Sequence, residues 1–275
     1  MHKQAVHAVN HQPLLHFLQQ DTLRHIVHLK MLALYGEAMT CHVLQQGEEK
    51  GCVLLLPTAV SDYDQRTYPD SQFVVLAAAT HPDLLHTLAL RVPTDQPLIF
   101  KLISPEQAEV FGHYFALQRL TAFISYTDQP QAAVSMPAGV VVSKGVVPEL
   151  LPLFAANGYS AEVVTGYFAK GQAVSFAVYG DGGGDGGETA VCACLAYHNY
   201  NNIWEIGALH TLPTARRQGH AQKVVAAAVH HLQINQLRPR YQFHESNHAS
   251  QQLAKKLGLI PFLTTTHFAC QPIIM

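Results

Sequence analysis

The feature that most constrains the fold is an order of elements that occurs twice. Residues 203–265 are predicted to form a strand, a helix, a strand, a helix and a tail, and residues 71–125 show the same order. Strands that alternate with helices are typical of an α/β sheet with helices packed on its faces. The two segments barely match residue by residue, so the repeat is one of pattern. We therefore expect two copies of one α/β plan.

A polar, proline-bearing stretch at residues 127–137, TDQPQAAVSMP, separates the two copies. Stretches of this kind are typical domain boundaries. A chain of 275 residues suits two modest domains better than one, and it is long enough to bury substantial cores. The sequence therefore predicts an N-terminal domain over residues 1–130 and a C-terminal domain over residues 138–275.

Composition narrows the class of protein. The chain is 48% hydrophobic and 13% charged with a net charge of −2, which predicts a globular protein and no basic surface for nucleic acid. The 18 histidines are scattered without an H-E-x-x-H pattern, and the five cysteines lack zinc-ligand spacing, so no metal site is expected. Cys192 and Cys194 are interpreted as buried thiols on one face of a strand. Without a secretory leader or a membrane-spanning stretch, we expect a cytoplasmic protein with no membrane partner.

Helical periodicity and capping residues place several helices. Apolar residues recur at helical spacing within 13–36, with Asp21 a candidate cap for a second helix there. Ser104 is a candidate cap for a helix in SPEQAEVFGHYF. Two helices over residues 147–171 precede three strand-like runs, which end in IWEIGALHT.

A glycine run at residues 180–187, GDGGGDGG, contains a formal G-x-G-x-x-G. A dinucleotide-binding fingerprint must open a helix whose N-terminus receives the pyrophosphate. Here the next residues, ETAVCACLAY, have the alternation of a strand. The run is therefore interpreted as a hairpin connection, in which glycine costs nothing sterically.

The stretch IGALHTLPTARRQGHAQKVVAAAVHHL, residues 206–232, carries the strongest chemical signal. A strand-like run breaks at Pro213, and a helix with one apolar face begins near Gly219. A helix start offers free N–H groups and a partial positive charge, and glycine lets a bulky anion approach the backbone. Arg216 and Arg217 add positive charge. The local chemistry favours a phosphate site, whereas an ordinary helix entry with two solvated arginines is the alternative.

Two motifs resemble the GNAT superfamily of N-acyltransferases. The pattern P-x-x-R-x-x-G-x-A at residues 213–221 is similar to the family's acyl-CoA-binding motif, in which main-chain amides surround the CoA pyrophosphate. The segment SNHASQQLAKKLGL at 246–259 resembles the family's N-x-x-S/A…L-G-F segment. The sequence of residues 204–219, WEIGALHTLPTARRQG, resembles that of the branch that contains glycine N-acyltransferase. Members of that branch also carry a degenerate GNAT-like N-terminal half. Residues 1–126 would suit that half.

This resemblance implies a fold and a cofactor. The expected fold is α/β (α+β), with tandem GNAT-like domains, each a mixed and mostly antiparallel central sheet flanked by helices. The expected co-substrate is acetyl-CoA or another acyl-CoA, whose pantetheine arm would pair with the backbone at residues 209–211. The residues expected to hold it are Leu209, His210, Thr211, Arg216, Arg217, Gln218, Gly219, His220, Ala221, Asn247 and Ser250.

Glu205 is the expected catalytic base, because the resemblance implies a glutamate at this position. In a regular strand Glu205 would share one face with residues 207, 209 and 211, on the cofactor side. A free carboxylate is a weak base unless burial raises its pKa or a water relays the proton. The alternatives are a structural role for Glu205, and His210, His244 or Glu245 as the base.

The family's usual general acid is missing. Many relatives place a tyrosine seven residues after the motif asparagine, where this chain has Ala254. Solvent or another group must supply the proton, or the thiolate leaves unaided. Four nearby residues are candidates: Tyr241, His244, His248 and Ser250.

We therefore expect an N-acetyltransferase that transfers an acyl group from acetyl-CoA to an amine in a ternary complex. The acceptor would be a small-molecule amine or an amino acid. The sequence leaves the oligomeric state open, and a homodimer is one possibility. The alternative is a catalytically silent acyl-CoA-binding or regulatory module that kept the cofactor loop. A nicotinamide oxidoreductase built on the glycine run is a distant third interpretation.

Overall fold

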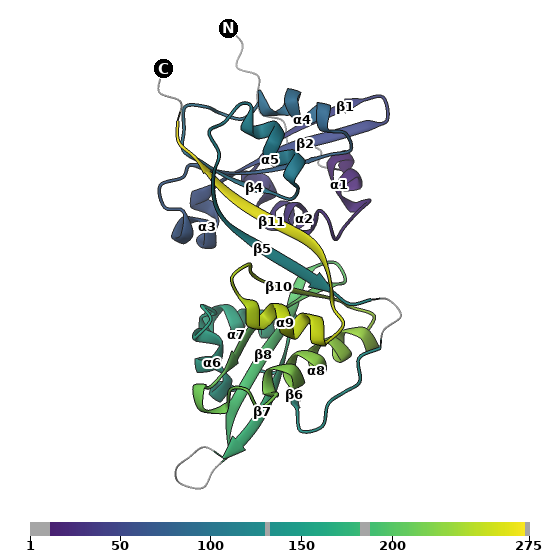
Figure 1. Ribbon diagram of the computed structural model, residues 1–275, viewed down its shortest axis with the longest axis vertical. Helices are drawn as coiled ribbons and strands as arrows, with labels where there is room; N and C mark the ends of the chain where they lie inside the picture. The colour runs from purple at the N-terminus through teal and green to yellow at the C-terminus, as the bar shows by residue number, and fades with distance from the viewer. Residues whose placement is uncertain (1–11, 130–132, 182–187, 273–275) are drawn as a thin grey trace. The chain divides into compact units, whose positions relative to one another are not determined.

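The computed structural model describes residues 12–129, 133–181 and 188–272, which form two compact units (Figure 1). One unit holds the chain up to Ala122 together with the segment from Leu263 onward, and the other holds Phe123–Phe262. The predicted division gave residues 263–275 to the C-terminal domain. The structure differs here, because the last strand pairs with strands of the N-terminal repeat.

The N-terminal unit is built on a sheet in the order β1-β2-β3-β4-β11. All pairs are antiparallel except β3 and β4, which run parallel. Its elements are α1 (Gln12–Gln19), α2 (Ile26–Tyr35), β1 (Thr40–Gln46), β2 (Glu49–Pro57), α3 (Asp62–Thr67), β3 (Phe73–Ala79), α4 (Pro82–Ala89), β4 (Leu98–Leu102), α5 (Pro105–Gly112) and most of β11 (Ile260–Cys270).

The C-terminal unit is built on a sheet in the order β5-β10-β9-β8-β7-β6. Here too one pair, β9 and β10, is parallel and the others are antiparallel. Its elements are the second half of β5 (Gln118–Thr127), β6 (Val141–Ser143), α6 (Leu151–Ala155), α7 (Ala161–Ala169), β7 (Ala173–Asp181), β8 (Glu188–Tyr200), β9 (Ile203–Thr211), α8 (His220–Ile234), β10 (Arg238–His244) and α9 (His248–Lys256).

The two units repeat one plan, as the sequence pattern predicts. The order β3-α4-β4-α5-β5 matches β9-α8-β10-α9-β11 element by element, and each series begins with a parallel strand pair. The last strands are exchanged, however. The first repeat's β5 pairs with β10, whereas the second repeat's β11 pairs with β4. The predicted tandem of mostly antiparallel sheets flanked by helices is confirmed.

Helices cover both faces of the C-terminal sheet. Face A carries α8 and α9, which pack on a core that includes Phe176, Ile206 and Tyr241. Face B carries α6 and α7, which pack on a core that includes Leu195 and Tyr197. Residues that alternate along β7, β8 and β9 divide between the two cores, so these three strands have two buried faces.

Local sequence signals start several helices. The Ser104 hydroxyl accepts a hydrogen bond from the Gln107 N–H at the start of α5, as predicted. Ser160 caps α7 in the same way through the Val163 N–H. Asp21 accepts from the Arg24 N–H at 3.0 Å but does not cap α2, whose N-cap is His25. The polar turn after α1 is longer than periodicity indicated, so the cap falls within that turn.

Candidate functional site

The site begins where two parallel strands separate. Strand β10 pairs with β9 only over Ile203–Ile206 of β9, and no strand among the described residues pairs with the rest of β9 on that side. Two carbonyls of this open edge accept hydrogen bonds from side chains instead. Asn157 donates to Leu209 O at 2.9 Å, and Arg216 donates to Thr211 O at 3.3 Å. A ligand that acts as an extra strand can therefore pair with this edge, where it would compete with Asn157 and Arg216 for the two carbonyls.

A β-bulge changes which side chains share a face of β9. The register with β8 shifts between Leu195↔Gly207 and Ala193↔His210, and Ala208 has a left-handed φ of 53°. One extra residue reverses the alternation beyond it. The predicted common face for residues 205, 207, 209 and 211 is therefore wrong. His210 follows Glu205 and Gly207 onto face B, whereas Leu209 packs against the face A core.

Helix α8 begins beyond that edge, at Gly219. Gly219 is the N-cap with φ 81° and ψ −1°, a left-handed conformation that favours glycine, and no side chain caps this helix end. The first helical bond runs from Lys223 N–H to Gly219 O, so the earlier N–H groups lack helical partners. A Cβ on Gly219 would meet no atom within 4 Å. Its conformation, not crowding, therefore accounts for the glycine within the isolated chain.

The predicted loop residues surround this helix start. Arg217 also has a left-handed φ, 63°, and successive turns of this kind point N–H groups into an anion-binding concavity. Both arginines are exposed. Gln218 donates to Thr214 O at 3.3 Å, and its Oε1 lies 3.2 Å from His220 Nε2. Ala221 is half-buried on the first turn. Main-chain N–H groups and positive charge therefore meet at one point, as anion binding requires.

Glu205 lies on face B and is 5% exposed. Its Oε2 accepts from Arg240 Nη1 at 2.5 Å and from Asn199 Nδ2 at 2.8 Å. Strand pairing explains this ion pair, because Arg240 stands directly opposite Glu205 in the β9–β10 register. The other oxygen, Oε1, accepts no hydrogen bond from any residue that the structure describes. Oε1 is therefore the oxygen that can accept a proton or hold a water.

Several polar atoms near Glu205 have no partner. Asn199 Oδ1, Arg240 Nε and Ser125 Oγ are buried on face B without a hydrogen bond to described residues. Ser175 Oγ, farther along face B, is a fourth such atom. Buried polar groups in proteins are nearly always satisfied by protein, water or ligand. This part of face B therefore has the chemistry of a hydrated or ligand-binding surface.

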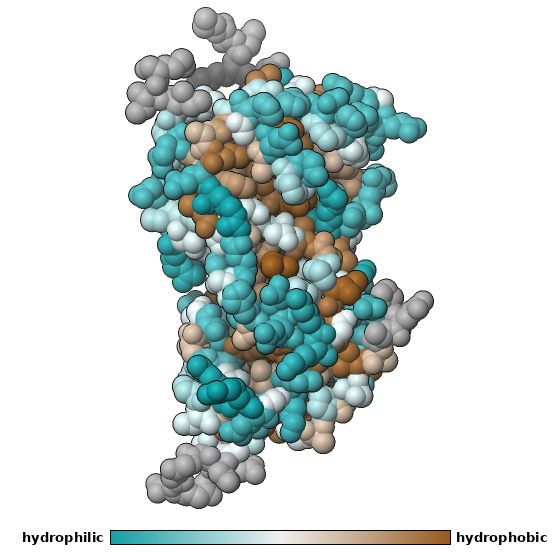
Figure 2. Space-filling view, in the orientation of Figure 1, coloured by the Kyte–Doolittle hydropathy of each residue, from teal (hydrophilic) through white to brown (hydrophobic). Residues whose placement is uncertain are grey.

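The second motif lies at the start of α9. Asn247 caps the helix by accepting from the Ser250 N–H at 3.0 Å, and Tyr241 Oη donates to Ser250 Oγ at 2.9 Å. Burial raises the pKa of Tyr241 to about 12. Ala254 is fully buried in the face A core, beneath the hydrophilic outer surface of α9 seen in Figure 2. Asn247 and Ser250 thus support the start of α9, and their cofactor-binding role stays a prediction.

The remaining candidates do not assemble into a single group. His244 is exposed and its Nδ1 lies 2.7 Å from Ser246 Oγ, and His248 is exposed on the first turn of α9. No group of three or more potential metal ligands occurs among the described residues. Within that same part of the chain, no helix is long and apolar enough to cross a bilayer.

Comparison with known proteins agrees with this geometry. The family model described as GNAT acetyltransferase matches residues 184–263, the segment from the end of the glycine run to the start of β11. No curated protein matches the chain significantly. Solved structures resemble the whole chain. The protein has a GNAT fold.

A GCN5-related N-acetyltransferase from Kribbella flavida has a TM-score of 0.56 and 15% identity, over 91% of this chain and 96% of that one. An acetyltransferase from the GNAT family of Colwellia psychrerythraea has a TM-score of 0.53 and 13% identity, over 94% and 97%. A third, from Sphaerobacter thermophilus, has a TM-score of 0.53 and 12% identity, over 82% and 77%. At these identities the likeness establishes the fold alone.

The N-terminal unit closes the equivalent opening with its own side chains. Strands β3 and β4 pair only over Phe73–Val75 of β3 and then separate. The Gln107 carboxamide bridges the gap, because its Nε2 donates to Ala77 O at 2.8 Å and its Oε1 accepts from Ile103 N–H at 2.8 Å. The His28 Nε2 also donates to Ala77 O, at 2.9 Å. The Gln107 carboxamide therefore bonds to backbone groups on both sides of this gap.

The helix that follows this closed opening is also unsuited to an anion. Helix α4 begins with Pro82, which has no N–H, and Asp83, which brings a negative charge to the first turn. Its N-cap, His81, accepts from the Asp83 N–H at 3.3 Å. Few donors remain at this helix start, in contrast to the glycine-capped start of α8.

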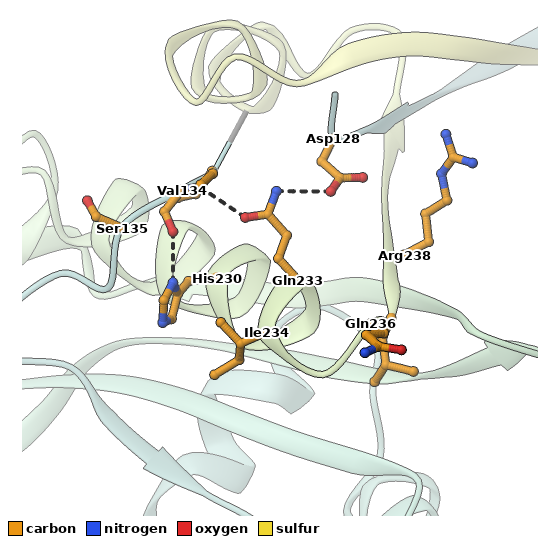
Figure 3. A pocket seen from close by; sticks show the side chains of 10 residues that line it. Asp128, Val134, Ser135, His230, Gln233, Ile234, Gln236 and Arg238 are labelled. Atoms are coloured by element: carbon orange, nitrogen blue, oxygen red, sulfur yellow. Dashed lines mark hydrogen bonds between the residues drawn. The ribbon is translucent and has the colours of Figure 1, made fainter. Parts of the chain in front are cut away.

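A groove of about 690 Å³ lies at the other end of α8 (Figure 3). The first residue of α8 that lines the groove is His230, so the groove begins about 16 Å along the helix from Gly219. Gln233 spans its wall by accepting from Val134 N–H at 3.0 Å and donating to Asp128 at 2.9 Å. His230 Nδ1 donates to Val134 O at 2.8 Å. These contacts attach the segment before β6 to α8, and the groove is separate from the loop at residues 216–221.

Sequence reasoning missed four residues at the site. Two of them lie on neighbouring strands: Arg240 in β10 and Asn199 near the end of β8. The other two, Asn157 and Tyr159, lie in the loop between α6 and α7. Only Arg240 carries a signal in the sequence, because a charged residue inside a strand-like run needs a buried partner. The other three become neighbours of β9 only through long-range packing.

Proposed function

We propose that the C-terminal unit binds acetyl-CoA, or a related acyl-CoA, and transfers the acyl group to an amine. The observation that carries this proposal is the left-handed Gly219 cap, which opens α8 with unbonded N–H groups just beyond an unpaired strand edge. Helix start and strand edge lie in series along the chain. A diphosphate suits the first and an amide-bearing arm suits the second.

Each chemical task has a residue in this proposal. The amides of residues 217–221 hold the pyrophosphate, with Arg216 and Arg217 adding charge. The open edge at residues 209–211 pairs with the pantetheine arm, and a main-chain N–H there stabilises the oxyanion. Glu205 Oε1 accepts the amine proton through a water, while Arg240 and Asn199 hold the carboxylate.

The acceptor is proposed to be a small-molecule amine or an amino acid, as the likeness to the glycine N-acyltransferase branch implies. A cytoplasmic location and a homodimer remain proposals of the same kind. All five cysteines are free, which suits a reducing compartment.

Calorimetry with CoA and acetyl-CoA tests the binding step. We expect wild type to bind one equivalent, and Gly219→Glu to lose binding because its carboxylate opposes the anion and its side chain strains the left-handed cap. Lys223→Glu, on the exposed side of the next turn, is a matched charge control that should weaken binding far less. Absence of heat with wild type would contradict the proposal.

Thiol release from acetyl-CoA with a panel of amines tests the transfer step. We expect turnover that is lost in Glu205→Gln while CoA binding persists. A second candidate function, a silent acyl-CoA-binding module, is favoured by Ala254 at the usual position of the acid and by the ion-paired state of Glu205. Binding without turnover on any acceptor would support that candidate instead.

A further inference from the structure

Tyr159 lies over the open edge of β9 at its first residue. A Cβ built on Gly207 would lie 2.7 Å from Tyr159 Oη and 3.4 Å from Tyr159 Cζ. Gly207 has no left-handed φ, so its conformation does not require glycine. The Tyr159 hydroxyl therefore accounts for the glycine at position 207, and any larger residue there would displace it.

Two contacts hold the Tyr159 hydroxyl in place. Its oxygen lies 3.1 Å from Tyr197 Oη, and Tyr197 stands opposite Glu205 in the β8–β9 register. The loop that carries Tyr159 is attached to the same strand, because Asn157 donates to Leu209 O at 2.9 Å. Tyr159 and Asn157 thus reach β9 on either side of the bulge, with Glu205 two residues before Gly207 on the same face.

Burial raises the pKa of Tyr159 to about 12. The hydroxyl therefore keeps its proton at physiological pH and can donate a hydrogen bond, but it is too weak an acid to give that proton to a thiolate outright. Donation without transfer is the role of fixed dipoles that stabilise charge as it develops. The usual acid position is Ala254, so any side chain that donates to the sulfur comes from another position.

We propose that Tyr159 is a catalytic residue that donates a hydrogen bond to the sulfur as the thioester breaks. This inference rests on the proposed acyl transfer. The amine nitrogen bonds to the acyl carbon, the C–S electron pair leaves on sulfur, and the Tyr159 O–H stabilises the thiolate while keeping its proton. The proton that the amine loses passes through a water to Glu205 Oε1 and on to solvent. A separate proton from solvent reaches the thiolate, which leaves as CoA thiol.

The test is Tyr159→Phe, which removes only the hydroxyl. We expect kcat to fall about 100- to 1,000-fold, as when one preorganised donor is lost, with the Kd for CoA unchanged. The melting temperature should fall slightly, because the buried Tyr197 hydroxyl loses a hydrogen-bond partner. Tyr167→Phe is the matched control, because Tyr167 packs against Tyr197 in the same cluster but its ring does not cover Gly207. Its kcat should stay near the wild-type value.

Gly207→Ala gives a second, independent measurement. Alone it should lower kcat as Tyr159→Phe does, because the new methyl group displaces the hydroxyl. In the Tyr159→Phe background it should have little further effect, which a double-mutant cycle detects as coupling. Wild-type turnover with an unimpaired Tyr159→Phe variant, or additive effects in the cycle, would overturn the inference. Absence of turnover or CoA binding in wild type would instead contradict the proposed function.

Discussion

At the scale of single residues, each unit contains a buried ion pair. Glu205 and Arg240 form an ion pair with both side chains at most 6% exposed, and Lys101 pairs with Asp64 at 2.6 Å in the N-terminal unit with similar burial. Such pairs contribute little net stability, but loss of one partner leaves a buried charge without compensation. They therefore make the positions of their strands depend on each other.

Arg240→Leu tests this dependence. We expect a loss of about 3–5 kcal/mol in the free energy of unfolding, measured by urea denaturation, because the Glu205 carboxylate would remain buried without its counter-ion. The double variant Glu205→Leu/Arg240→Leu should be more stable than Arg240→Leu alone. Arg238→Leu, at a half-buried position two residues earlier, is the control. A double variant no more stable than the single one would contradict the expectation.

Two buried histidines of the N-terminal unit predict a pH dependence. Burial lowers the pKa of His28 and of His267 to about 3 in each case, from an ordinary value near 6.5. The unfolded chain binds these protons below pH 6.5 and the folded chain does not. Their contribution is therefore complete above pH 6.5 and is lost as the pH falls toward 3.

Urea unfolding at pH 7 and at pH 5.5 measures this effect. Each histidine should lower the free energy of unfolding by up to about 1.4 kcal/mol per pH unit below 6.5. His28→Gln should reduce this slope, whereas His16→Gln, at an exposed position of α1, should leave it unchanged. A slope that is the same in wild type and His28→Gln would argue against the buried neutral state.

At the scale of elements, the two units differ at the point where their parallel strands separate. In each unit, parallel strands separate and expose backbone groups. The C-terminal unit follows this opening with a glycine-capped helix, and the N-terminal unit fills it with the Gln107 carboxamide. The same geometry therefore serves as a candidate cofactor site in one unit and as a packed core in the other.

Gln107→Ala tests whether that closure is structural. Ile103 N–H would lose its buried partner, which should cost about 1–3 kcal/mol in the free energy of unfolding. The number of CoA equivalents bound should stay at one, because α4 offers no anion site. Gln107→Glu keeps an acceptor for Ile103 N–H but loses the donor to Ala77 O and buries a carboxylate, so it should cost at least as much. Two equivalents bound by wild type would contradict this account.

At the scale of the whole molecule, strand exchange joins the repeats. The C-terminal unit includes part of β5 from the first repeat, and the N-terminal unit includes most of β11 from the second. If the chain were cut between the repeats, β4 would lose its neighbour β11 but keep β3. In the other fragment, β10 would lose its neighbour β5 but keep β9. An uncovered central strand exposes apolar surface and unpaired backbone groups.

Two fragments of similar length distinguish the possibilities. Residues 138–275, the C-terminal domain predicted from sequence, lack β5 and should show no cooperative unfolding by circular dichroism. Residues 118–262 retain β5 beside β10 and should fold, because they hold every strand of the C-terminal unit. Cooperative unfolding of the first fragment, with collapse of the second, would contradict the observed strand exchange.

The sequence by itself determined the local features of this protein. Helical periodicity and glycine placed the start of α8, a serine cap placed α5, and the twofold order of elements indicated the tandem plan. These features depend on residues within a few turns of one another, where propensity and capping act. The candidate cofactor loop was therefore predictable from its own residues.

Only the tertiary structure decided which distant residues meet. The bulge at Ala208 placed His210 on the face of Glu205, strand pairing set Arg240 beside Glu205, and loop packing placed Tyr159 over Gly207. The exchange of β5 and β11 is of the same kind. Alternation and motif spacing carry no information about a register shift or a partner from another strand, because those follow from packing the whole core.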